Sequence, residues 1–170
     1  MIRAGIGLLL VWVMAALLVR GVFGDLLALG GVRPDLLTLV VVYWGLAAGP
    51  MGGTLAGFLV GLVADADLGR GLGLQAGLLS AVGFAAGQAG RHLIREHLIL
   101  QAAVSGIAAL VVGFGRALVL THDAGGHSLL PFLPSVLASA AYTALLGPAL
   151  YWTVRVLRLP DPLARVHPEE

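Results

Sequence analysis

The side chains of this chain that could do ionic chemistry gather around one glycine-rich stretch. The sequence GPMGGTLAGFLVGLVADADLG, residues 49–69, ends with two carboxylates, Asp65 and Asp67. A carboxylate at the C-terminal end of a helix opposes the helix macrodipole, so another group must stabilise it. Four arginines are available as partners: Arg20, Arg33, Arg70 and Arg116.

Catalysis and metal binding are poorly supported by these residue types. Ser80, Ser105, Ser135 and Ser139 are separated from any histidine by helical spacing, and Asp65 and Asp67 point to opposite sides of their backbone. The five histidines fall in polar loops or the tail, without a pair at the spacing of a helical metal site. The chain has no cysteine and therefore no thiolate ligand or nucleophile. We expect no catalytic residue, no metal and no cofactor.

Composition places the chain in a membrane. Of its 170 residues, 59% are hydrophobic and 11% are charged, more apolar than a soluble core requires. Runs such as LILQAAVSGIAALVVGFG are apolar on every face, which favours helices over the alternating strands of a membrane barrel. The net charge is +1 and the basic residues are scattered arginines, so the sequence gives no support for nucleic-acid binding.

The apolar runs predict an all-α polytopic membrane protein with six transmembrane helices in one domain, residues 1–157, and a polar tail, 158–170. Pro34 or Asp35 should start the second helix, and AAGPMGG forms a tight turn after it. The second and third helices are short for free-standing spans and should form a buried hairpin. The spans are expected at about 4–24, 34–48, 51–64, 72–89, 98–120 and 135–156.

The distribution of arginine predicts the orientation. With a cytoplasmic N-terminus, six arginines lie in cytoplasmic elements and two, Arg33 and Arg70, lie outside. This satisfies the positive-inside rule and places both termini in the cytoplasm. The carboxylates then lie near the outer leaflet, where Asp25, Asp35, Asp65 and Asp67 should form a polar cluster with Arg20, Arg33 or Arg70. We favour structural pairing over a proton or substrate relay, because no span carries a chain of carboxylates and imidazoles.

The glycines explain how the apolar helices could associate. Gly49, Gly53, Gly57 and Gly61 follow one another at every fourth position, so they form a groove along one face of a helix. Small residues let helix backbones approach closely in lipid, where the hydrophobic effect does not drive association. The row resumes after the loop as Gly69, Gly73 and Gly77, which indicates that both flanking helices use glycine faces.

The stretch RPDLLTLVVVYWGLAAGPMGGTLAGFLVGLVADADLGRGLGLQAG resembles the bacterial MreD family of rod shape-determining proteins. The resemblance covers residues 31–80 closely, and the second acidic residue of DAD leaves open whether Asp65 or Asp67 takes the family position. The matching residues are Arg33, Pro34, Asp35, Tyr43, Trp44, Gly49, Pro50, Gly57, Phe58, Gly61, Leu62, Asp65, Gly73 and Leu74.

The resemblance implies a non-enzymatic, multi-pass scaffold of the bacterial inner membrane that acts in cell elongation. Its implied partners are the single-span protein MreC, MreB filaments, and the peptidoglycan synthase RodA with its class B penicillin-binding protein; homo-oligomers are compatible with it. The family is similar in its six-helix arrangement to the substrate-capture subunits of energy-coupling-factor transporters. Capture of a vitamin-type small molecule is therefore the alternative function. The resemblance further suggests that the groove of Gly49–Gly61 is a docking or internal packing seam, and that Asp65 at its end ties the third helix to the Arg33–Asp35 turn.

Overall fold

The computed structural model describes Met14 and residues 32–68, 73–92, 98–123 and 129–156, and this part of the chain is almost entirely helical. The expected first span, 4–24, lies outside the described residues apart from Met14, and the tail, 158–170, lies outside them entirely. Four α-helices account for most of the described chain: α2 (Leu36–Leu68), α3 (Leu74–His92), α4 (Leu98–Asp123) and α5 (Leu133–Val156). A short 3₁₀ helix, η1 (Leu130–Phe132), leads into α5.

Helix α2 is two helices joined by a sharp break at Gly49. This residue has φ 78° and ψ −176°, a combination that is open almost only to glycine. Pro50 follows it, and its fixed φ and missing N–H suit the first position of a new helix. The chain folds back at this point, because a Cβ built on Gly53 would lie 2.8 Å from the Cα of Gly45. Eight residues along a straight helix would separate those positions by about 12 Å.

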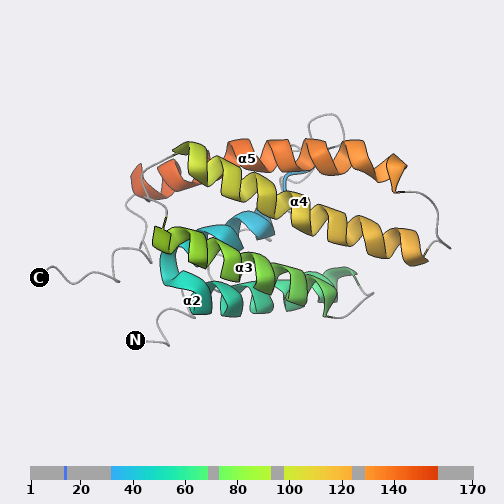
Figure 1. Ribbon diagram of the computed structural model, residues 1–170, viewed down its shortest axis with the longest axis horizontal. Helices are drawn as coiled ribbons and strands as arrows, with labels where there is room; N and C mark the ends of the chain where they lie inside the picture. Colours follow the sequence, from blue (N-terminus) through green and yellow to red (C-terminus); the bar gives the residue numbers. More distant parts are fainter. Residues whose placement is uncertain (1–13, 15–31, 69–72, 93–97, 124–128, 157–170) are drawn as a thin grey trace, which may run out of the picture.

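The helices form two layers, and each layer is a pair of antiparallel helices (Figure 1). The second half of α2 packs along α3, and α4 packs along α5. The first half of α2 lies between these pairs, and every residue from 37 to 45 is buried. This short segment is therefore the centre of the described structure.

The packed core consists mainly of valine and alanine contributed by α2, α3 and α4, together with two leucines and a tryptophan. Val41, Val60, Leu79 and Val112 are almost completely buried within it. Large apolar side chains such as Phe58, on the outer face of α2, are exposed instead. An apolar exterior around a tightly packed interior is the arrangement expected of a helical protein in lipid.

Three described helical stretches are long and apolar enough to cross a membrane: Leu36–Ala66, Ile99–Thr121 and Leu130–Leu150. Gly49 divides the first of them into two oppositely directed halves. Pro148 lies within α5 and does not end the helix, which continues to Val156. The structure thus belongs to the all-α class and has the character of a membrane protein.

Candidate functional site

The Arg33–Asp35 turn is fixed first by its own sequence. Asp35 caps α2, because its Oδ1 accepts a hydrogen bond from the N–H of Thr38 at 3.2 Å and its carbonyl accepts one from Leu39 at 3.1 Å. The helix therefore begins at Leu36, one residue after Asp35. Pro34, expected at the first helical position, instead precedes the cap.

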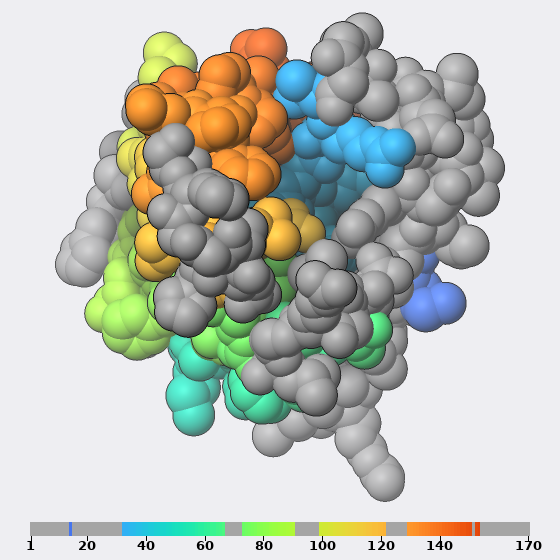
Figure 2. Space-filling model, turned by 90° about the vertical axis from the view of Figure 1, so that its right-hand side faces the viewer, coloured from blue at the N-terminus to red at the C-terminus, as the bar shows by residue number. Residues whose placement is uncertain are grey.

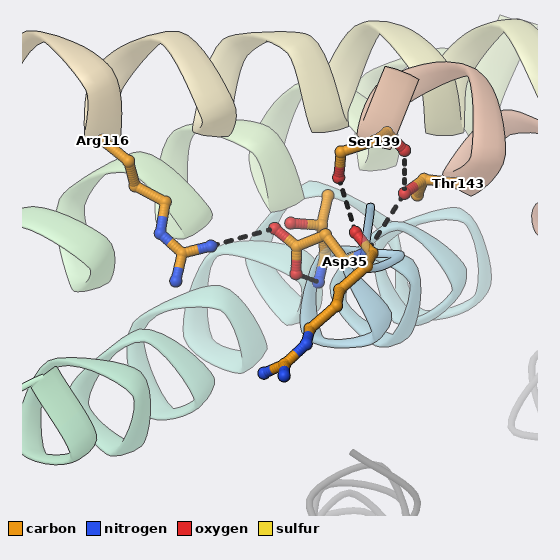
Figure 3. A network of polar contacts seen from close by, with 6 residues as sticks. Asp35, Arg116, Ser139 and Thr143 are labelled. Carbon is orange, nitrogen blue, oxygen red and sulfur yellow. Dashed lines mark hydrogen bonds and ion pairs between the residues drawn. The ribbon is translucent and has the colours of Figure 1, made fainter. Parts of the chain in front are cut away.

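Helix α5 holds this turn from the other side. The N–H of Asp35 donates to Oγ1 of Thr143 at 3.0 Å, and the hydroxyl of Ser139 donates to the carbonyl of Arg33 at 2.8 Å. The Thr143 hydroxyl in turn donates to the carbonyl of Ser139 at 2.7 Å. Two residues one helical turn apart on α5 thus satisfy backbone groups that the start of α2 leaves unpaired (Figure 3).

Arg116 brings a positive charge from α4 to the same turn. Its Nη1 lies 3.8 Å from Oδ2 of Asp35, and its side chain is about one-third exposed. Figure 3 shows the guanidinium reaching from α4 toward the carboxylate. A guanidinium carries five N–H donors, and among the described residues this ion pair is the one polar contact of the Arg116 side chain. Most of its hydrogen-bonding capacity is therefore not used by the described residues.

Asp65 has a different role from Asp35. Its side chain is 1% exposed, and it accepts three backbone hydrogen bonds, from the N–H groups of Gly73 at 2.8 Å, Gln75 at 3.0 Å and Ala76 at 3.1 Å. These N–H groups lie at the start of α3, where the helix has no internal acceptors for them and its macrodipole favours negative charge. The end of α2 thus supplies the cap of α3.

This contact corrects two expectations about the carboxylates. Asp65 joins α2 to α3 rather than to the Arg33–Asp35 turn, and the N-terminus of a helix supplies its stabilisation. Asp35 is paired with Arg116, which we did not expect in the polar cluster. The described aspartates therefore occupy two separate sites. Arg20, Asp25, Gly69 and Arg70 lie outside the described residues, and the side chain of Asp67 is also not described.

The glycine groove packs against α3. A Cβ added to Gly53, Gly57 or Gly61 would collide with the α3 backbone, at Gly83, Leu79 and Ala76 respectively. Gly49 is needed for the turn and not for room at this contact, because a Cβ there would meet nothing within 4 Å.

The α3 side of this contact differs from the expected row. Gly77 is exposed and has open space at its Cβ position, while Gly73 lies before α3 with φ 100°. The close approach is made by Gly83, against Gly53, and by Gly87, against Pro50. The four-residue spacing continues through Gly77, but the face of α3 that meets α2 carries Ala76, Leu79, Gly83 and Gly87 instead.

A cavity of about 230 Å³ lies between the Arg33–Asp35 turn and the neighbouring helices. Figure 2 looks onto the corresponding end of the bundle, where the start of α2 (blue) lies beside α5 (orange) and the end of α4 (gold). The cavity is lined by both polar and apolar residues. Its polar lining comprises Arg33, Asp35, Gln75, Arg116 and Ser139, and its apolar lining comprises Pro34, Leu36, Leu37, Ala64 and Leu79.

Sequence reasoning did not single out Gln75 and Thr143, and it considered Ser139 only as a nucleophile that lacks a nearby histidine. A weak signal existed for Ser139 and Thr143, which are polar, lie four residues apart and therefore share one face of an apolar helix. Gln75 was also a polar residue at the start of an apolar run. Neither pattern says which distant segment these side chains will meet.

Comparison with known families gives the context for this arrangement. The family model of the rod shape-determining protein MreD matches residues 2–157, nearly the whole chain. The chain belongs to the MreD family. Searches among curated proteins and among solved structures found no significant match. Family membership indicates a role in determining rod shape, carried out by a helical membrane protein.

Proposed function

We propose that this chain is a non-enzymatic scaffold of the cell-elongation complex in the bacterial inner membrane, where it binds MreC and helps to regulate peptidoglycan synthesis. The observation that carries the proposal is the MreD family match over residues 2–157. The proposed topology has six spans, with both termini in the cytoplasm. The proposed partners beyond MreC are MreB, RodA and its class B penicillin-binding protein.

The described packing is compatible with a scaffold. The α2–α3 contact is backbone against backbone at several glycines, which makes a stiff element because the helices cannot slide without collision. The polar residues that do meet, at Asp35 and at Asp65, hold helix ends in place.

Loss and capture experiments test the proposal. Cells that lose the gene for this chain should become round, and its return should restore the rod shape. The tagged chain, extracted in mild detergent, should retain MreC, whereas an unrelated polytopic membrane protein extracted in the same way should not. Rod-shaped growth without the gene, or equal recovery of MreC with the control protein, would contradict the proposal.

The cavity favours one second candidate, a substrate-capture subunit of a transporter. Pockets for drug-sized ligands usually begin at about 300 Å³, and the cavity between the described residues is about 230 Å³. A vitamin-sized ligand would therefore require the site to open. Native mass spectrometry separates the candidates, because a stoichiometric vitamin-sized metabolite together with an ATPase module would favour the transporter.

A further inference from the structure

We propose that the cavity beside the Arg33–Asp35 turn binds the phosphate group of a small anionic ligand. The inference rests on the cavity and its side chains and does not depend on the scaffold role. Two arginines and one aspartate contribute to the described lining, so its formal charge is positive by one. Guanidinium groups pair with phosphate through several N–H donors at once.

The first observation that points to a ligand is the buried side-chain amide of Gln75. Its side chain lines the cavity and is only 2% exposed. Its backbone N–H is bonded to Asp65, but its side-chain amide forms no hydrogen bond with the residues that the structure describes. Buried amides almost always have a partner. A ligand in the cavity would provide one, and the amide would donate to a phosphate oxygen.

The second observation that points to a ligand is the position and pairing of Arg116. Its one ion pair among the described residues, with Asp35 at 3.8 Å, is longer than a hydrogen bond. It also precedes the end of the apolar stretch Ile99–Thr121 by five residues, or about 8 Å along the helix. A charged residue at such a depth in a membrane span usually faces a polar cavity and marks a functional site. A bound phosphate would complete the partners of this guanidinium.

The remaining lining agrees with a ligand that is part apolar. Leu36, Leu37 and Leu79 line the cavity together with the charged groups. The volume of about 230 Å³ accommodates a phosphate and a few further atoms but not a large soluble metabolite. The phosphate of a lipid headgroup or a free phosphate compound would present the same chemistry to Arg116 and Gln75.

The test measures binding to the full chain purified in micelles of a neutral maltoside detergent, which contains no phosphate group that could occupy the site. Phosphatidylglycerol is titrated in one arm and inorganic phosphate in the other, with native mass spectrometry and calorimetry as the measurements. Saturable binding of phosphatidylglycerol alone identifies a lipid headgroup as the source. Displacement of that lipid by inorganic phosphate identifies a site that also accepts free phosphate. Absence of saturable binding in both arms overturns the proposal.

Two variants and a control connect that binding to the cavity. Gln75→Leu removes the amide without breaking a described protein hydrogen bond, and Arg116→Gln removes the charge. Each should weaken binding by about tenfold or more, as expected for one hydrogen bond to a charged group. Gln88→Leu, an exposed position on the same helix, should leave the affinity unchanged. Unchanged binding by Gln75→Leu, or equal loss in Gln88→Leu, overturns the proposal even if Arg116→Gln fails to fold.

Discussion

At the scale of single residues, Asp35 and Asp65 show how the same side chain solves two different problems. Asp35 caps its own helix through Thr38, and its second oxygen faces Arg116. Asp65 caps the next helix, with both oxygens used by N–H groups of α3. In lipid, unpaired N–H groups at a helix start cost several kcal/mol each. Both carboxylates are therefore structural in the first place.

Replacing each aspartate by asparagine should separate these roles. Asp65→Asn leaves one acceptor oxygen for three N–H groups and places an NH₂ group against them, so we expect a loss of about 1–3 kcal/mol in the free energy of unfolding. Asp35→Asn keeps a good N-cap and loses only the partly exposed ion pair, which should cost less than about 1 kcal/mol. Thermal unfolding of the detergent-solubilised variants, followed by size-exclusion chromatography, measures the difference. Equal melting temperatures for the two variants would contradict this assignment.

At the scale of elements, the hairpin of α2 and its contact with α3 are governed by where side chains are absent. Gly49 allows the reversal because of its backbone conformation, whereas Gly53, Gly57 and Gly61 allow close approach because of their size. The distinction matters for substitution. A side chain at Gly49 would strain the backbone dihedral angles. A side chain at any of the other three would collide with the α3 backbone.

Gly57→Ala and Gly77→Ala form a matched pair for testing the contact. The new methyl group at Gly57 would collide with the carbonyl of Leu79, so the helices must separate, at a cost of about 1–3 kcal/mol. Gly77 has open space around its Cβ position, so alanine there should stabilise α3 by up to about 1 kcal/mol. Melting temperatures in the same detergent should move in opposite directions. A destabilised Gly77→Ala together with a neutral Gly57→Ala would show that the packing face is the other one.

At the scale of the whole molecule, the two helix pairs are joined through the Arg33–Asp35 turn. Ser139 and Thr143 of α5 bind its backbone, and Arg116 of α4 binds its carboxylate. The turn lies well below the helix ends, since Ser139 follows the start of the apolar stretch Leu130–Leu150 by nine residues, or about 14 Å. The cavity lies at the start of the short central half of α2.

The orientation of this end of the bundle can be tested directly. The excess of arginine in the elements assigned to the cytoplasm predicts that reporters fused after Arg95 and at the C-terminus will read cytoplasmic. A reporter fused after Gly125 should read periplasmic. Alkaline phosphatase and green fluorescent protein fusions provide the two complementary signals, and a periplasmic C-terminus would refute the six-span topology.

The sequence by itself determined the class of this protein. Composition and unbroken apolar runs specify membrane helices, since backbone polar groups in lipid must be satisfied within the segment. The stretch from Arg33 to Leu74 was enough to suggest the MreD family, which the match over residues 2–157 establishes. Glycine spacing also indicated that helices approach closely, because spacing alone fixes which residues share a face.

Only the tertiary structure decided the partners. The sequence allows Asp65 to pair with any of several arginines. In the structure it instead accepts a hydrogen bond from Gly73 at the start of α3, eight residues further along the chain. Asp35 and Thr143 are 108 residues apart, and no local pattern encodes the rotation that turns Thr143 toward Asp35. Gly83 rather than Gly77 meets α2 for the same reason. Periodicity fixes one helix face relative to another on the same helix, whereas the packing of whole helices decides which faces meet.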